Sequence, residues 1–141
     1  MTEVVLALGI TSFCLVALMG LFAVGIRTEK ESADILQVSH LSQKLLAMRR
    51  NTPDSNLGAK FPIPALQPGS SIAKTVVNLD QNGLIAPSAA EARYALTYRV
   101  DAPAVGSRKN FSVYLNFHWP AQASPANAAG HYEVLASIPP R

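Results

Sequence analysis

The stretch of residues 4–26 constrains this chain most, because its 23 consecutive residues include no charged side chain. An α-helix rises about 1.5 Å per residue, so this stretch would be about 34 Å long as a helix. That length crosses the hydrocarbon core of a bilayer, which is about 30 Å thick. A buried core helix of a soluble protein is the alternative, but such helices average only about 11 to 12 residues. We therefore predict that residues 1–26 form a transmembrane helix.

The helical pattern continues beyond the apolar stretch. Apolar residues recur every three or four positions at Ile35, Val38, Leu41, Leu45 and Met48, and Leu36 and Leu46 widen this stripe. We predict an amphipathic continuation of the helix over residues 27–50, with one face packed on a sheet. The helix should stop before Pro53, because a proline disfavours the helical conformation at the residue ahead of it.

The remainder of the chain predicts a small sheet. Residues 51–74 hold four prolines and two glycines, so we expect a proline-rich loop with at most a short strand. Residues 75–141 should form an antiparallel β-sheet domain of about four strands, with the clearest alternation of apolar and polar residues in 93–101, 111–119 and 131–138. Connections of about ten residues suit a meander. The predicted fold class is α+β, a long N-terminal helix packed on this sheet.

Small and acidic residues in and before the apolar stretch are the candidate functional residues. Gly9, Gly20 and Gly25 would let neighbouring helices approach closely. Glu3 stands directly before the apolar run, where a carboxylate is costly unless it finds water or a cation. It has two interpretations at this point, a functional role or an interfacial residue favoured by the dipole at the helix N-terminus.

The segment Thr2-Glu3-Val4-Val5-Leu6-Ala7-Leu8-Gly9-Ile10 resembles the start of type IV pilins and type II secretion pseudopilins, whose mature chains begin Phe-Thr-Leu-x-Glu before an apolar helix. Glu3 falls on the invariant glutamate of that family. Residues 13–26 are most similar to minor pilins, including the set called Verru_Chthon cassette protein B. The strand at 94–100, the segment 119–121 and the terminal segment 132–138 are similar to that set too.

The resemblance implies the pilin fold and a minor pilin or pseudopilin subunit of a type IV pilus-like or type II secretion-like filament. Such a subunit sits in the bacterial inner membrane with its globular domain in the periplasm. It would assemble by helix packing at Gly9, Gly20 and Gly25, with Glu3, beside Thr2, pairing with the N-terminus of a neighbouring subunit. Its partners would be other pilin or pseudopilin subunits, an inner-membrane assembly platform and membrane lipid. The alternative is a single-pass, membrane-anchored binding module that does not polymerise.

The chain departs from the family at its start. Pilins carry a short basic leader that a prepilin peptidase removes, whereas Met1 here occupies the third mature position by register. Basic residues after the span, such as Arg27 and Lys30, would by themselves keep the following domain in the cytoplasm. A basic leader would restore the orientation of a pilin, so we expect that the start at Met1 is truncated.

No pattern in the sequence predicts catalysis, a cofactor or a metal. His40, His118 and His131 lack partners at metal-ligand spacing. Asp80, Asn82 and Gly83 partly resemble a calcium loop without its closing glutamate, and a plain turn is favoured. The net charge of +3 is scattered, with no basic cluster longer than two residues, so we expect no nucleic-acid partner. We expect a protein that is not an enzyme.

Overall fold

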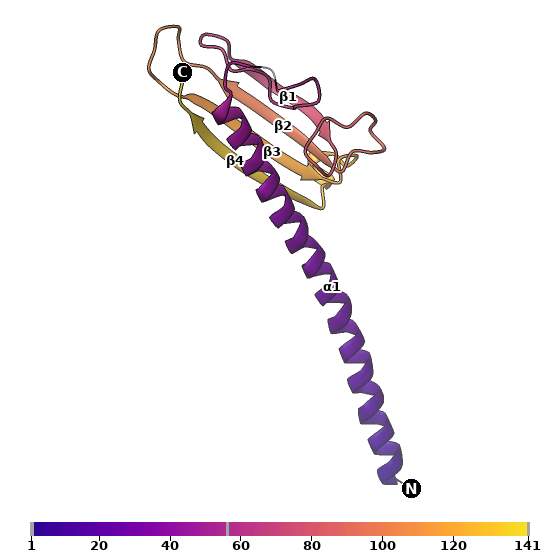
Figure 1. Cartoon of the computed structure of the whole chain (residues 1–141). Coiled ribbons are helices and arrows are strands. Elements are labelled where there is room, and N and C mark those ends of the chain that lie inside the picture. The colour runs from indigo at the N-terminus through magenta and orange to yellow at the C-terminus, as the bar shows by residue number, and fades with distance from the viewer. Residues whose placement is uncertain (1, 56, 141) are drawn as a thin grey trace. The chain divides into compact units, whose positions relative to one another are not determined.

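The computed structural model describes residues 2–55 and 57–140, so Met1 lies outside the described residues. Along the chain the elements are α1 (Thr2–Asn51), β1 (Ile72–Leu79), β2 (Tyr94–Asp101), β3 (Phe111–Trp119), the short 3-10 helix η1 (Pro125–Asn127) and β4 (Gly130–Ile138) (Figure 1). The chain divides into two compact units, one ending at Asp34 and one beginning at Ile35. Each unit is described by itself below.

The predicted α+β fold is confirmed, with a long N-terminal helix and a four-stranded antiparallel sheet on which its C-terminal part packs. The strands lie in the order β1-β2-β3-β4, so every strand pairs with its neighbour in sequence, as in the predicted meander. β2, β3 and β4 begin and end within one residue of the predicted strands. β1 begins earlier, at Ile72, inside the segment 51–74 for which we predicted a loop with at most a short strand.

The core lies between the sheet and the last turns of α1. Alternate residues of the central strands, such as Leu96 in β2 and Leu115 in β3, are fully buried on this face. Val38, Leu41 and Leu45 of α1 join the same cluster, together with Ile63 and Leu66 from the loop before β1. One face of the sheet is therefore covered by the helix and by that loop.

The buried helix stripe differs in part from the predicted one. Val38, Leu41 and Leu45 are buried as expected, but Ile35 and Met48 are 46% and 38% exposed. The residue that follows Met48 replaces it in the core, since Arg49 is only 1% exposed. At about 100° per residue, a position 11 residues after Val38 returns to the same face, whereas one 10 residues after it does not. Leu36, expected to widen the stripe, is also exposed.

Arg49 organises the chain where α1 ends. Its terminal guanidinium nitrogens donate to the main-chain carbonyls of Thr52, Pro53, Ser55 and Ile63. The guanidinium also lies over the ring of Phe61, 5.1 Å from its centroid. Burial lowers the pKa of Arg49 from its ordinary value, but the side chain stays charged because arginine starts so far above neutral pH. The cation thus gives hydrogen bonds to carbonyl groups that follow the end of the helix, although the Pro53 carbonyl also accepts one from the backbone nitrogen of Leu66.

The segment after β1 forms a turn, as the sequence favoured. The Asp80 carboxylate accepts hydrogen bonds from the backbone nitrogens of Asn82 and Leu84, at 2.8 and 3.0 Å. Burial opposes ionisation of Asp80, but these backbone bonds outweigh it and lower its pKa. Gly83 has a φ of +83°, and a Cβ there would lie 2.7 Å from Leu41 Cδ1. Only glycine meets both the conformation and the close approach of the helix.

Candidate functional site

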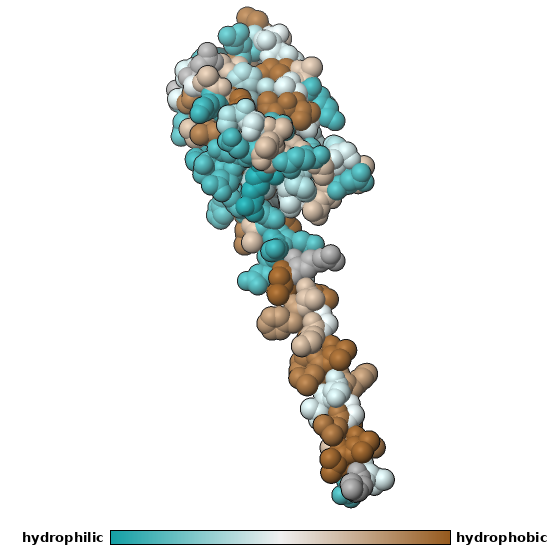
Figure 2. Space-filling view, turned by 90° about the vertical axis from the view of Figure 1, so that its right-hand side faces the viewer, coloured by the Kyte–Doolittle hydropathy of each residue, from teal (hydrophilic) through white to brown (hydrophobic). Residues whose placement is uncertain are grey.

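All the residues that the sequence proposed for assembly lie in the first half of α1. Every large apolar side chain between residues 4 and 26 is at least half exposed, from 50% at Ile26 to 76% at Phe13. Figure 2 shows this hydrophobic surface as brown side chains along the helix. The helix is long and apolar enough to cross a membrane. In water this surface would be strongly unfavourable, so it needs lipid or other apolar helices around it.

Two hydroxyl groups in and directly after this half of the helix are hydrogen-bonded within the helix. Thr11 Oγ1 donates to the carbonyl of Ala7 at 2.8 Å, and Thr28 Oγ1 donates to that of Val24 at 3.1 Å. Hydrogen bonds of this kind, one turn back along the helix, remove the need for water as a partner. Thr11 therefore adds little cost to placing the helix in hydrocarbon.

The helix distributes the candidate residues over two faces. At about 100° per residue, positions 11 apart differ by only about 20°, so Gly9 and Gly20 share a face, and Thr2 lies within about 20° of Gly9. Gly25 lies about 160° from Gly9, on the other side. Glu3 is within about 40° of Gly25 by the same geometry. The five candidates thus form two sets, Thr2-Gly9-Gly20 and Glu3-Gly25.

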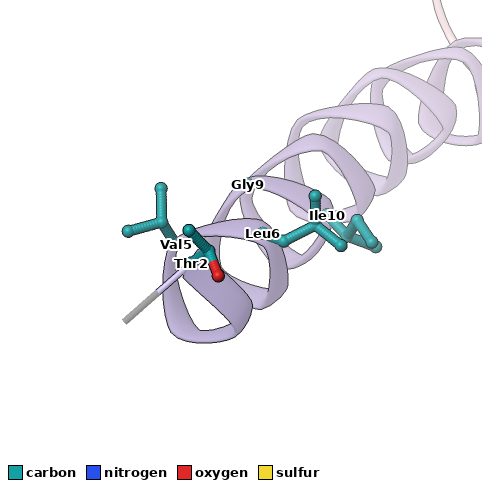
Figure 3. Close-up of a pocket in the computed structure, with 5 residues that line it drawn as sticks. All are labelled: Thr2, Val5, Leu6, Gly9 and Ile10. Carbon is teal, nitrogen blue, oxygen red and sulfur yellow. The ribbon is translucent and has the colours of Figure 1, made fainter.

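The glycines leave open surface on the helix. Apart from the two neighbouring residues and the backbone of the helix itself, a Cβ atom at Gly9, Gly20 or Gly25 would meet no heavy atom of the described residues within 4 Å. Around Gly9, the side chains of Thr2, Val5, Leu6 and Ile10 border a shallow, almost entirely apolar depression (Figure 3). This surface has the small central residue and apolar border that close helix packing uses.

Glu3 lies in the first turn of α1, and its side chain is exposed. Among residues 2–55 and 57–140, its carboxylate has no hydrogen bond and no ion pair. A carboxylate in the first turn is favoured by the helix dipole by about 0.3–1 kcal/mol. The position therefore satisfies the interfacial interpretation and leaves the carboxylate available to a cation from another molecule.

The structure places two of the three histidines opposite each other in the sheet, a pairing that the sequence did not predict. His40 is exposed on α1, whereas His118 of β3 and His131 of β4 are opposite each other in the sheet. Within the described part of the chain, no group of three or more His, Cys, Asp or Glu side chains is arranged to hold a metal ion.

Comparisons with protein-family models, with curated proteins and with solved structures found no match to this chain.

Sequence reasoning missed two polar features. Arg49 was treated only as one of several basic residues, although its spacing of four from Leu45 was a signal of burial. Thr97, Asn116 and His118 occupy the positions between the core residues of β2 and β3, which the strand alternation assigned to a solvent face. Thr97 and His118 are nevertheless buried, at 7% and 5% exposure.

Proposed function

We propose that this chain is a minor pilin or pseudopilin subunit that is anchored in a membrane by residues 1–26 and assembles into a filament by packing that helix. The observation that carries the proposal is the uninterrupted exposure of every large apolar side chain from residue 4 to residue 26. The resemblance of residues 2–10 to pilin N-termini and the order of a long helix followed by an antiparallel meander support it. A bacterial inner membrane and a periplasmic globular domain complete the proposal.

The apolar surface suits two environments in turn. A single helix of this length is stable in lipid, because all its backbone groups are bonded internally. The same surface is stable in a bundle of identical helices, where neighbouring helices replace lipid and close contact at Gly9 and Gly20 adds dispersion energy. A subunit of this design can leave the bilayer for a filament without exposing its apolar side chains to water.

Glu3 would set the register between subunits. In the proposed filament its carboxylate pairs with the N-terminal amine of a neighbouring subunit, inside a sheath of apolar side chains. Such a pair is strong because the local dielectric constant is low, and an unpaired Glu3 would be costly there for the same reason. Correct axial placement is thereby favoured over every placement that leaves the charge alone.

The two faces of the helix give a direct test. Cys14 lies 11 residues after Glu3 and so on its face, within about 20°, whereas Val16 lies within about 20° of Gly9. In a filament each subunit meets neighbours on more than one face. Oxidative crosslinking in cells should therefore give dimers with Cys14 alone and with Val16→Cys in a Cys14→Ala background. A chain carrying both cysteines should give a ladder of multimers.

The role of Glu3 is tested in the same assay. Glu3→Ala and Glu3→Gln should abolish the ladder, whereas Glu29→Ala, which removes an acidic residue beyond the apolar stretch, should leave it intact. A ladder that persists in both Glu3 variants would refute the pairing. Monomers at all positions would refute assembly and favour the tethered binding module. A dimer on one face only, with no ladder in the double-cysteine chain, would identify a closed pair of subunits.

A further inference from the structure

A small cavity with several polar side chains around it opens on the face of the sheet opposite the core. It has a volume of about 70 Å³ and is lined by Lys74 of β1, Thr97 of β2, Tyr114, Asn116 and His118 of β3, and Pro125 of η1. Five of these six residues carry a polar side chain. At this volume, the cavity has room for a few water molecules or for one small chemical group.

Two of the lining side chains are more than nine-tenths buried yet lack a partner. Thr97 is 7% exposed and His118 is 5% exposed. Neither the hydroxyl nor the imidazole makes a hydrogen bond to any other described residue. Buried polar groups are nearly always hydrogen-bonded, because losing water without a replacement is costly. Both groups line the cavity, so a molecule inside it is the available partner.

The neighbouring side chains are arranged to donate. Asn116 Nδ2 donates to Glu133 Oε1 at 2.6 Å and to the Tyr114 hydroxyl oxygen at 3.3 Å. The carboxylate of Glu133 can only accept, which fixes the orientation of the Asn116 amide. Because the Tyr114 oxygen accepts this bond, its own proton is free to be donated elsewhere. Lys74 adds a positive charge, is exposed and has no ion pair among the described residues.

We propose that this cavity binds an oxyanion group, a carboxylate or a phosphate, through Lys74, Thr97, Tyr114 and His118. Three side chains can each donate one hydrogen bond, and the Lys74 ammonium supplies the opposite charge, a combination that favours anions over neutral groups. The volume admits the charged group and not the remainder of a larger molecule. The site is formed by the sheet and η1, so it does not depend on the proposed assembly of the helix.

The test uses the full-length chain in detergent micelles, observed by amide and imidazole NMR. Sodium acetate and sodium phosphate are titrated separately against sodium chloride at equal ionic strength. We expect saturable shifts at Thr97, Tyr114 and His118 with acetate or phosphate and none with chloride. The anion that saturates first identifies the group. Triglycine and its C-terminal amide then distinguish a carboxylate carried on a peptide from the free ion.

Two variants separate this site from non-specific binding. Lys74→Met should weaken anion binding about tenfold, the loss expected for one charge-assisted contact, whereas Lys109→Met, an exposed lysine outside the cavity, should not. Thr97→Val keeps the shape and removes an unpaired hydroxyl, so its melting temperature should stay equal or rise while affinity falls. Shifts that never saturate, or that are equal in both lysine variants, mean an adventitious ion only and overturn the proposal. Full affinity in a folded Thr97→Val chain overturns it too.

Discussion

The two halves of α1 satisfy their apolar side chains in different ways. In residues 35–51, Val38 and Leu45 are buried to 2% exposure or less against the sheet of the same chain. In residues 4–26, no large apolar side chain is less than half exposed. The second half of the helix therefore depends on tertiary packing, and the first half depends on lipid or on other molecules. One continuous helix combines a part that packs in the globular core with a part that is long and apolar enough to cross a membrane.

The largest difference in unfolding free energy should come from replacing one leucine by alanine in each region. Leu115→Ala removes a fully buried side chain from the central strand β3 and should lower the free energy of unfolding by about 4 kcal/mol. Leu18→Ala, in the apolar stretch, should change it by less than about 0.5 kcal/mol. Denaturant titration followed by the fluorescence of Trp119, the single tryptophan, measures both. Equal losses would show that the apolar stretch contributes to the globular core.

A charge in the middle of the apolar stretch should impair membrane insertion and leave the stability of the globular part unchanged. Leu15→Arg should raise the apparent free energy of membrane insertion by about 3 kcal/mol and leave the Trp119 unfolding midpoint unchanged. Carbonate extraction and a glycosylation-based insertion assay measure the first quantity, with Leu15→Ala as the matched control. If Leu15→Arg fractionated with the membrane as well as the control did, residues 4–26 would not be the anchor.

Arg49 tests how the globular unit satisfies polar groups that it buries. Arg49→Met retains much of the aliphatic bulk but leaves the carbonyls of the 52–63 segment without their donor, and should cost about 2–3 kcal/mol of unfolding free energy. Arg50→Met, one residue further along and exposed, should cost less than about 0.5 kcal/mol. Membrane association should be equal in both variants. Similar unfolding midpoints for the two would mean that the guanidinium does not organise this loop.

The smallest effect concerns Asp80. Its pKa is lower in the folded chain than the unfolded value of about 3.9, so its carboxylate stabilises the fold above that pH. The contribution is lost as the pH falls through the folded pKa. Asp80→Ala should cost less than about 1 kcal/mol at pH 7, because the group is largely solvated. The difference from the native chain should shrink below pH 4; a constant difference from pH 7 to pH 3 would contradict the role of the ionised carboxylate.

The sequence by itself determined the elements whose patterns are long and regular. Twenty-three uncharged residues predict one long helix because length and composition suffice. The alternation in β2, β3 and β4 predicts strands because a pleated sheet places every second side chain on one face. Short connections then favour a meander. The early start of β1 was not predicted, because Pro68 and Gly69 lie close before Ile72 and favour a loop. Pairing with β2 overrides these local preferences.

Tertiary structure alone decided which polar groups are buried. Helix geometry places Arg49 rather than Met48 on the core face, but only the loop between α1 and β1, which returns over the helix, brings carbonyl groups to its guanidinium. Thr97 and His118 are buried because Pro125, distant in sequence, closes one side of a cavity on a face that alternation assigned to solvent. The periodicity of a helix or strand predicts which of its faces a side chain lies on, whereas burial depends on which other segment of the chain packs against that face.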